Sequence, residues 1–412
     1  MRRDVFSTVG FEPKAMLTLG ASSLDFRNIS RNDSFLVRTS VNSTLPRPLR
    51  TDRAFLSYAP HPTRLPDGFR LYIFVGEPGS DPSDLIGSKS AIILPASFNY
   101  LGEADVLRIS PHWRAVRTLY RNSSRFNAIL LTEQCNSYCL MCSQPPKPTD
   151  DSWIVEETLK LLPLIDPSAG EICFSGGEPT LLGARLIRIL KSAEAWLPNT
   201  SVHVLSNGRR FSDLDFAVEY ASVGHHDIMV GIPLYSDLST HHDYVVQADG
   251  AFDETIRGIL NLKRAKARVE LRIVVHKQTY ARLRELAEFI TRNLLFVDHV
   301  ALMGLELTGF TKPNLEQLWI DPHDYQHQLE VAVAHLARHR MNVSIYNHQL
   351  CVLRPTLWEF ARQSISDWKN EYMPECQSCS VRTRCGGFFS SGLSKPSQHI
   401  HALADTSALL RS

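Results

Sequence analysis

The sequence predicts an α/β protein in which a parallel sheet curls into a full or partial barrel, preceded by a small β-rich domain. From residue 121 onward, apolar segments of strand length alternate with amphipathic helical segments in six successive units. This alternation is typical of a parallel sheet covered by helices. Before residue 121, short apolar stretches are separated by turns rich in Pro, Gly and Asp. The site of such a barrel is expected at the carboxyl ends of its strands.

Composition excludes several classes of partner. The chain has 412 residues, 43% of them apolar, which is enough for one large domain with appendages. Its 44 Lys and Arg balance 43 Asp and Glu, so no global field attracts nucleic acid or anionic lipid. The amino terminus lacks a signal-peptide core, and no apolar run reaches the roughly 18 residues of a membrane helix. We therefore expect a cytoplasmic protein without nucleic-acid or membrane partners, whose clustered cysteines bind metal or act in catalysis.

The β-rich domain is expected over residues 1–120. Its apolar stretches lie at 34–40, 69–76 and 90–96. Three roles remain open for this domain, namely peptide recognition, docking to a partner protein and plain structural packing.

The barrel is expected over residues 121–345. Asp151 or Ser152 can cap its first helix. The predicted strands span 127–132, 171–176, 201–207, 227–235, 269–276 and 299–307, and the predicted helices span 153–165, 184–197, 213–222, 252–265, 281–294 and 324–340.

Three cysteines follow the first predicted strand. Cys135, Cys139 and Cys142 follow one another at steps of four and three positions, a spacing that would also fit one face of a helix in a buried stripe. Asn136-Ser137 favours a turn, however, and Pro145-Pro146 cannot continue a helix. The segment is therefore interpreted as a metal-binding loop.

The motifs CNSYCLMC and Gly176-Gly177-Glu178-Pro179 resemble the CX3CX2C cluster loop and the GGEP motif of the radical S-adenosylmethionine (radical SAM) superfamily. The resemblance implies that Cys135, Cys139 and Cys142 hold three irons of a [4Fe-4S] cluster, whose fourth iron binds S-adenosylmethionine. An electron from a flavodoxin or ferredoxin type of donor would then produce a 5'-deoxyadenosyl radical.

Further cofactor contacts follow from the same resemblance. Met141 replaces the usual aromatic residue before the third cysteine and is expected to pack near the adenine. Gly176 and Gly177 admit a close backbone approach, Pro179 completes the motif, and Glu178 is expected to accept a hydrogen bond from the methionine ammonium.

Three weaker assignments lie on later strands. Asn207 ends the third strand, Ser236 follows the fourth as a ribose contact, and Arg272 lies on the fifth as a carboxylate partner. An ordinary turn or surface role is the alternative for each. Cys173 lies within an apolar strand and is assigned to the core.

Five polar residues flank the fourth strand. A role in proton transfer and a structural or capping role are both open for them. They are His225, His226, His241, His242 and Asp243.

A second cysteine group, Cys351, Cys376, Cys379 and Cys385, supplies enough thiolates to close a metal site. Its CX2CX5C core resembles the auxiliary-cluster region, of the SPASM or the shorter twitch type, of radical peptide maturases. Phe389 stands where the longer version has a further cysteine. The resemblance implies one auxiliary [4Fe-4S] cluster in residues 346–390, and a zinc staple is the alternative. Residues 391–412 are expected to form a mobile tail.

The amino-acid sequence around these motifs resembles that of the HxsC-type maturase of the His-Xaa-Ser system over roughly residues 70 to 390. It implies a precursor peptide as substrate, with a sister radical SAM maturase and a small companion protein as partners. Two other hypotheses stay open. The chain could act on a small molecule, or it could be a metal-bound scaffold without catalysis.

Overall fold

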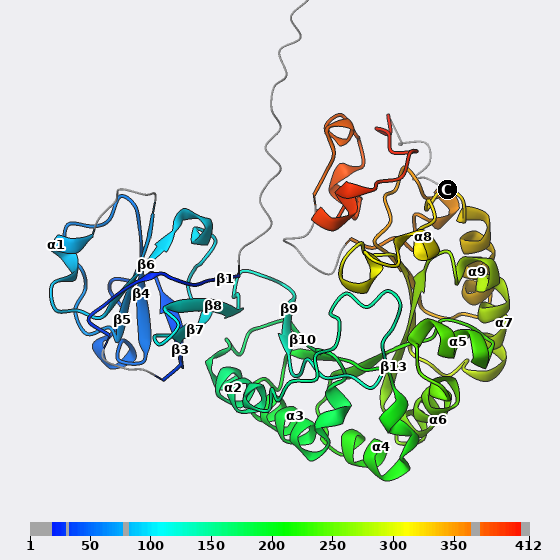
Figure 1. The fold of residues 1–412 in the computed structure, drawn as a ribbon, viewed down its shortest axis with the longest axis horizontal. Coiled ribbons are helices and arrows are strands. Elements are labelled where there is room, and N and C mark those ends of the chain that lie inside the picture. The colour runs from blue at the N-terminus through cyan, green and yellow to red at the C-terminus, as the bar shows by residue number, and fades with distance from the viewer. Residues whose placement is uncertain (1–18, 30–32, 77–81, 364–370, 405–412) are drawn as a thin grey trace, which may run out of the picture.

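The computed structural model describes residues 19–29, 33–76, 82–363 and 371–404. These residues form a β-rich domain, an open barrel and an irregular C-terminal region that lies above the barrel in Figure 1. Residues 1–18, 30–32, 77–81, 364–370 and 405–412 of the predicted regions lie outside this description.

The N-terminal domain is built on an eight-stranded mixed sheet in the described part of the chain, with the order β1-β8-β7-β3-β4-β5-β6-β2. A short helix, α1 (Ser83–Ile86), connects β5 and β6. Two clusters of buried apolar side chains form its core. The strands are β1 (Gly20–Ala21), β2 (Asp25–Arg27), β3 (Phe35–Ser40), β4 (Arg53–Tyr58), β5 (Leu71–Gly76), β6 (Ala91–Pro95), β7 (Val106–Ser110) and β8 (Ala115–Tyr120).

The second sheet has seven parallel strands in chain order, from β9 to β15. No pairing joins β9 to β15 within the described residues, so the barrel is partial. This topology confirms the predicted fold class. The strands are β9 (Asn127–Leu130), β10 (Glu171–Ser175), β11 (Ser201–Leu205), β12 (Ile228–Pro233), β13 (Arg268–Val275), β14 (His299–Gly304) and β15 (Val343–Tyr346).

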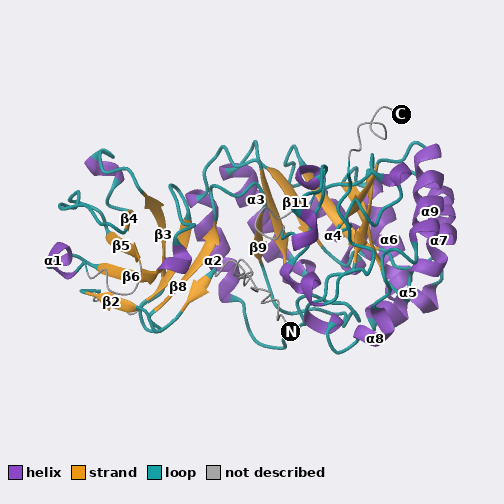
Figure 2. Cartoon of the chain, turned by 90° about the horizontal axis from the view of Figure 1, so that it is seen from above, coloured by secondary structure: helices purple, strands orange, loops and turns teal. Residues whose placement is uncertain are grey.

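Helices cover the outer face of this sheet (Figure 2). They pack against its strands in one large buried apolar cluster. The helices are α2 (Trp153–Leu161), α3 (Ala184–Trp196), α4 (Leu214–Ala221), α5 (Ser239–Val246), α6 (Ala251–Arg264), α7 (Leu283–Asn293), α8 (Leu315–Leu318) and α9 (Gln326–Arg338). None of the helices in the described ranges combines the length and the apolar character needed to cross a membrane.

The structure adds three elements to the predicted barrel series, namely β15, α5 and the four-residue helix α8. Strand β15 has only four residues and is flanked by polar side chains, so its apolar signal is weak. Helix α5 carries the polar run STHHDY, which gives little helical periodicity. The first predicted helix also ends earlier, at Leu161, and continues as a short 3-10 turn because Pro163 cannot donate a backbone hydrogen bond.

The N-terminal domain docks on the barrel through specific contacts. Val106 and Tyr120 from its sheet belong to the apolar cluster of the barrel. Two ion pairs also cross the boundary, Arg38 to Asp166 at 2.7 Å and Arg108 to Glu157 at 3.0 Å. The last strands of the domain are thereby held against the open side of the barrel.

Residues 390–404 are held by hydrogen bonds. Ser397 and the backbone of Gln398 donate to Asp321 at 2.6 and 3.0 Å, and the backbone of Ser380 donates to the Leu403 carbonyl at 3.0 Å. Up to residue 404 this stretch is thus in contact with the barrel and with the cysteine region, and the mobility expected from residue 391 stays a prediction.

Candidate functional site

The loop with the first three cysteines begins where β9 ends and is fixed at both of its ends. At its start, Thr132 donates through its hydroxyl to Asp151 at 3.0 Å, and the backbone of Glu133 also donates to that carboxylate. Asp151, predicted as a helix cap, therefore ties the first residues of the loop to the start of α2. Ser152 occupies the N-cap position without a side-chain hydrogen bond.

The glycine motif packs directly on this loop. The backbone of Gly177 donates to the Thr132 carbonyl at 2.8 Å, and the backbone of Glu178 donates to the Gln134 carbonyl at 2.7 Å. A Cβ atom on Gly177 would lie 2.1 Å from the Gln134 oxygen, and one on Gly176 would lie 2.3 Å from the Thr132 oxygen. Only glycine fits there, because the approach is between two backbones. The close approach predicted for this motif is therefore made to the cysteine loop.

The second half of the loop rests on α5 and on the segment after β14. The backbones of Tyr138 and Leu140 donate to the carbonyls of Val246 and Val245, each at 3.0 Å. Phe310 donates through its backbone to the Cys142 carbonyl at 2.8 Å. These contacts come from two separate parts of the barrel and fix the loop at its carboxyl end.

The three loop thiols are half-buried. Burial raises the pKa of Cys135 to about 11 and that of Cys139 to about 12, with the neighbouring cysteines adding to the effect. The three thiols lie on one short loop, and a bound cation favours their thiolate form. The loop therefore fits a thiolate-ligated iron cluster.

The side chain of Glu178 is anchored by hydrogen bonds within the protein. Its carboxylate is fully buried and accepts hydrogen bonds from protein groups on both oxygens. The donors are the backbone and hydroxyl of Thr180, at 2.9 and 2.6 Å, the hydroxyl of Ser206, at 2.8 Å, and the backbone of Asn207, at 2.6 Å. Burial raises the pKa of this carboxyl group. Glu178 therefore joins the ends of β10 and β11. Three of these donors contact Oε1 and one contacts Oε2, and the predicted contact of Glu178 with the methionine ammonium stays a prediction. Pro179 begins the buried 3-10 turn that follows.

Asn207 and Arg209 hold the cysteine loop from β11. Asn207 donates through its amide to the Asn136 side chain at 2.6 Å. Arg209 donates to the Asn136 carbonyl at 2.5 Å and is paired with Glu254 at 2.6 Å. The sequence analysis identified Asn207 and missed Arg209, although its position four residues beyond the end of β11 was a signal.

Met141 is buried in an apolar cluster with Leu140, Tyr235 and Val245 under the cysteine loop. Ser236 is buried, and its hydroxyl accepts a hydrogen bond from the backbone of Leu238 at 3.1 Å. The contacts predicted for Met141 with adenine and for Ser236 with ribose stay predictions.

A charged network lies deeper in the barrel. Glu270 on β13 is paired with Arg272 at 2.8 Å and with His299 at 2.7 Å, and His203 lies 3.5 Å away. Although burial would raise the pKa of Glu270, the hydrogen bond from His299 and the charge of Arg272 lower it to about 2. Arg272, predicted as a carboxylate partner, is thus paired with a carboxylate of the chain itself. Cys173 on β10 is half-buried and lies outside the apolar core to which its sequence context assigned it, and burial raises its pKa to about 12.

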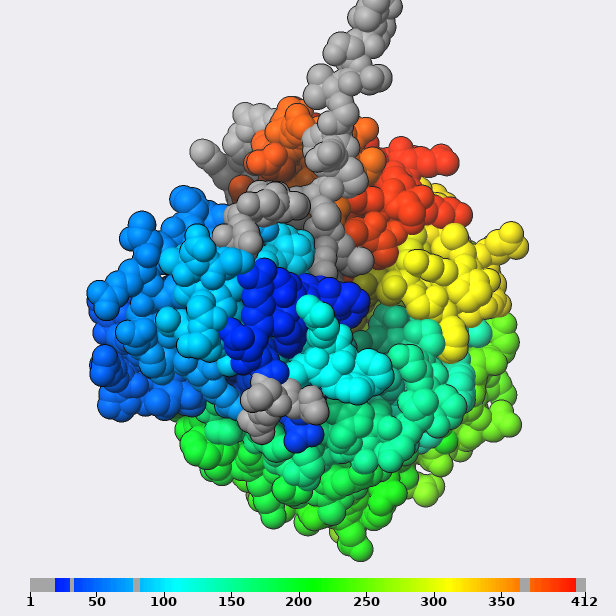
Figure 3. Space-filling view, turned by 60° about the vertical axis from the view of Figure 1, so that its left-hand side comes forward, coloured from blue at the N-terminus to red at the C-terminus, as the bar shows by residue number. Residues whose placement is uncertain are grey.

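A cavity of about 530 Å³ connects this network with the N-terminal domain. Cys173, His203 and Arg272 line it from the barrel, and Arg121 lines it at the end of β8. Phe389 of the C-terminal region contributes as well. In Figure 3 the N-terminal domain (blue to cyan) lies directly beside the first part of the barrel on this face. Three regions of the chain therefore build one cavity.

The C-terminal cysteines converge on a second, small pocket. Cys351, Cys376, Cys379 and Cys385 all line it, together with His401. Burial raises the pKa of Cys351 to about 11, and a hydrogen bond from the backbone of His401 opposes this effect. Four sulfur donors around one pocket fit a metal site closed by protein ligands.

The polar residues around β12 make structural contacts. His225 contacts the Leu197 carbonyl at 3.2 Å, and buried His242 accepts from the backbone of Tyr235 at 3.3 Å. Asp243 accepts from the backbones of Gly250 and Phe252, each at 2.7 Å, and so shapes a turn.

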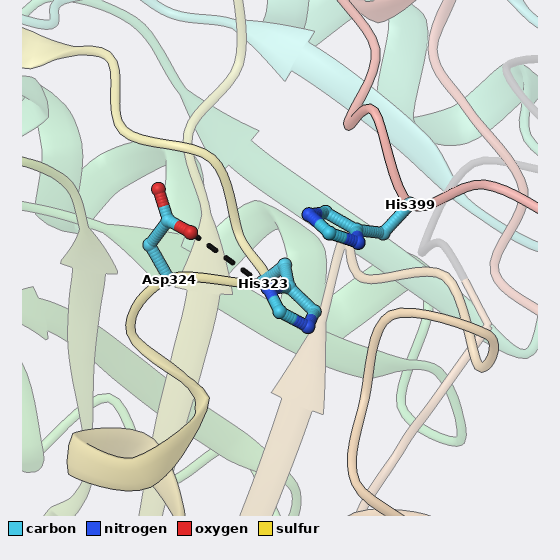
Figure 4. Close-up of side chains that lie close together, drawn as sticks. All are labelled: His323, Asp324 and His399. Atoms are coloured by element: carbon cyan, nitrogen blue, oxygen red, sulfur yellow. Dashed lines mark ion pairs between the residues drawn. The ribbon is translucent and has the colours of Figure 1, made fainter.

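His323, Asp324 and His399 form an exposed group with potential ligand atoms (Figure 4). The two imidazole rings are stacked, with centroids 3.6 Å apart and planes 14° from parallel. Imidazole binds metal through a lone pair in the ring plane, so two stacked rings do not direct their lone pairs at one ion. This geometry does not favour a metal site.

Residues 129–290 match the family model described as the Radical SAM superfamily. No curated protein matches the sequence.

Several solved structures are similar at low identity. SuiB from Streptococcus suis bound to S-adenosylmethionine is 16% identical with a TM-score of 0.43, and the match covers 53% of this chain and 50% of that one. Native anSMEcpe with bound AdoMet is 14% identical with a TM-score of 0.48, covering 69% and 94%. HemN from Escherichia coli, a coproporphyrinogen III oxidase, is 13% identical with a TM-score of 0.39, covering 52% of each chain. This chain thus spans about half the length of SuiB, and the likeness assigns no substrate.

Proposed function

We propose that this chain, whose residues 129–290 match the model of the Radical SAM superfamily, is a radical SAM enzyme that modifies a ribosomally made peptide. The observation that carries the proposal is the clamp between two motifs. The cysteine loop is hydrogen-bonded along its backbone to Gly177 and Glu178, and it lies where the parallel strands end. A catalytic metal site of three protein ligands leaves a position open for a substrate or cofactor.

Cys135, Cys139 and Cys142 would hold the [4Fe-4S] cluster, which, with S-adenosylmethionine bound, supplies a 5'-deoxyadenosyl radical for hydrogen abstraction. The contributions of the chain itself are positioning and shielding. Tyr138 and Leu140 fix the loop on α5. The buried side chains of Leu140 and Met141 exclude water from its underside.

The cavity supports a peptide substrate. It extends from the charged network of the barrel to the N-terminal domain and is lined by three regions of the chain. Its walls combine aromatic residues such as Trp153 and Phe389 with polar and charged residues such as Arg121 and Asn347. A peptide presents both apolar side chains and hydrogen-bonding amides, which suits such a lining.

The C-terminal pocket is proposed to hold an auxiliary [4Fe-4S] cluster on Cys351, Cys376, Cys379 and Cys385. A zinc ion would be satisfied by the same four thiolates, and metal analysis distinguishes the two.

The narrower assignment to the HxsC type is part of this proposal and rests on sequence resemblance alone. It names a His-Xaa-Ser precursor peptide, a sister radical SAM maturase, a small companion protein and a flavodoxin or ferredoxin donor. The cytoplasm, where thiols stay reduced, is the expected location.

The proposal is tested with a variant in which Cys135, Cys139 and Cys142 are all Ala. Reductive cleavage of S-adenosylmethionine, followed as release of 5'-deoxyadenosine, should be lost, while metal stays bound to the C-terminal cysteines. Retention of cleavage in this variant would refute the assignment. Co-expression with a His-Xaa-Ser peptide, followed by mass spectrometry, then tests the substrate class. An unchanged peptide mass with active cofactor cleavage would favour a small-molecule substrate.

A further inference from the structure

Polar atoms without partners gather around the large cavity. Nε and Nη1 of Arg121, Nε2 of His203 and Oδ1 of Asn347 are buried and make no hydrogen bond in the described part of the chain. All three residues line the same cavity. A buried polar group without a partner costs free energy, and each case in a native protein needs an explanation. A bound ligand that supplies the missing partners is such an explanation.

The three residues come from different elements. Arg121 follows β8 of the N-terminal domain, His203 lies on β11, and Asn347 follows β15. His203 has only an electrostatic contact with Glu270, at 3.5 Å. The unpaired groups include donors on Arg121 and an acceptor on Asn347, so the ligand must offer both acceptors and donors, as a peptide does.

Half of the Arg and Glu residues that line the cavity belong to ion pairs. Arg108 is paired with Glu157 at 3.0 Å, Arg272 with Glu270 at 2.8 Å, and Glu133 with Lys147 at 2.6 Å. The barrel wall also carries the carboxylates of Glu171 and Glu306, whereas the wall of the N-terminal domain carries Arg117 and Arg121. The positive charge of the cavity therefore lies on the N-terminal wall.

Arg121 has no carboxylate partner within 4.0 Å among the described residues. Burial raises the pKa of nearby Asp105 to about 6, and Arg121 opposes this effect. Both Asp105 oxygens, however, are engaged by backbone donors, Gly102 at 2.8 Å and Asn122 at 2.7 Å. The guanidinium of Arg121 is therefore a cation without a direct anionic partner.

Arg121 is also held in position. Its guanidinium carbon lies 5.1 Å from the centre of the Tyr100 ring, and Nη2 donates to Ser123 at 3.4 Å. A fixed guanidinium loses less conformational entropy on binding and recognises planar carboxylates well.

We propose that Arg121 binds the carboxylate of an acidic side chain in the substrate peptide and thereby selects peptides with Asp or Glu near the modified residue. Asn347 accepts a hydrogen bond from the backbone of the same peptide. This inference rests on the proposed function, because it names the substrate class of that site.

Three short Gly-Ser peptides with a fluorescent label test the inference. The first has a central Glu and an amidated carboxyl terminus, the second has Gln instead, and the third has Gln with a free carboxyl terminus. Each is titrated against the anaerobically prepared holoprotein, and the dissociation constant is measured by fluorescence anisotropy. We expect the Glu peptide to bind about tenfold more tightly than the amidated Gln peptide.

Arg121→Gln should abolish this preference, and Arg121→Lys should keep part of it, because it retains the charge without the planar fork. Arg125→Gln is the matched control, since Arg125 is exposed and does not line the cavity. The inference is overturned by equal affinities in the wild type, by a preference that survives Arg121→Gln, or by a preference only for the free carboxyl terminus. Cleavage of S-adenosylmethionine by the wild-type protein is measured separately. A failure of the proposed function would abolish this cleavage, whereas a failure of the present inference would remove only the preference for the Glu peptide.

Discussion

The carboxylate of Glu178 accepts a hydrogen bond of 2.6 Å from the backbone of Asn207. This contact joins the end of β10 to the end of β11 directly beneath the cysteine loop. The residues on both sides of this hydrogen bond hold the loop. The backbones of Gly177 and Glu178 contact it from the end of β10, and the side chain of Asn207 contacts it from the end of β11. The position of the candidate iron ligands therefore depends on a fully buried acid whose side chain is hydrogen-bonded to none of them within the described residues.

Glu178→Gln should destabilise the protein even without S-adenosylmethionine. The NH2 group of the new glutamine side chain would face groups that themselves donate hydrogen bonds. Those buried donors would lose their acceptor, which costs roughly 1–3 kcal/mol. The free energy of unfolding of the cofactor-free protein, measured in urea, checks this, with exposed Glu194→Gln as the control. Weaker cofactor binding at unchanged stability would instead support the ammonium contact predicted from the sequence.

Gly177→Ala should displace the cysteine loop, because its Cβ would lie 2.1 Å from the Gln134 oxygen. We expect the iron bound by Cys135, Cys139 and Cys142 to be lost while the C-terminal site keeps its metal. Iron per chain after anaerobic reconstitution is the measurement. Gly170→Ala is the control, since no atom lies within 4 Å of a Cβ there. Wild-type iron content in Gly177→Ala would contradict the clamp.

Glu270→Gln should lower the free energy of unfolding by about 3 kcal/mol at pH 7, because it leaves Arg272 buried without its anion. Glu156→Gln is the control. It breaks the 2.7 Å pair with Arg188, whose partners are 55% and 60% exposed, and should cost less than about 1 kcal/mol.

The effect of Glu270 should depend on pH. Its pKa is about 2 in the folded protein against an ordinary value of 4.5, so its contribution to stability is present above pH 4.5 and is lost as the pH falls toward 2. The difference in the free energy of unfolding between the wild type and Glu270→Gln, measured in urea, should therefore be smaller at pH 3.5 than at pH 7. An equal difference at both pH values would argue against a charged Glu270.

Metal analysis should find about eight irons and matching sulfide per chain, as two [4Fe-4S] clusters require. Iron, zinc and sulfide are measured on the anaerobically prepared protein. Four irons with one zinc would mean that the C-terminal cysteines bind a structural zinc ion in place of an iron–sulfur cluster. Zinc without iron after reconstitution would contradict the radical enzyme itself.

Local patterns in the sequence determined much of this protein. The alternation of strands and helices predicted the parallel sheet, and the spacing of Cys135, Cys139 and Cys142 predicted a loop at its carboxyl end. Both signals lie within short stretches, where covalent geometry sets the period of each element. The weak elements β15 and α5 were missed because their sequences carry little apolar periodicity.

Only the tertiary structure decided which distant residues meet. The amide of Asn207 reaches Asn136, 71 positions earlier, and Arg121 shares a cavity with Asn347 and Phe389. The hydrogen bonding of Glu178 with protein donors is of the same kind, because Ser206 and Asn207 lie on another strand. Such contacts depend on the curvature of the sheet and on how the N-terminal domain docks. No local period encodes either of these, so the sequence by itself placed the cysteine loop and the fold placed its supports.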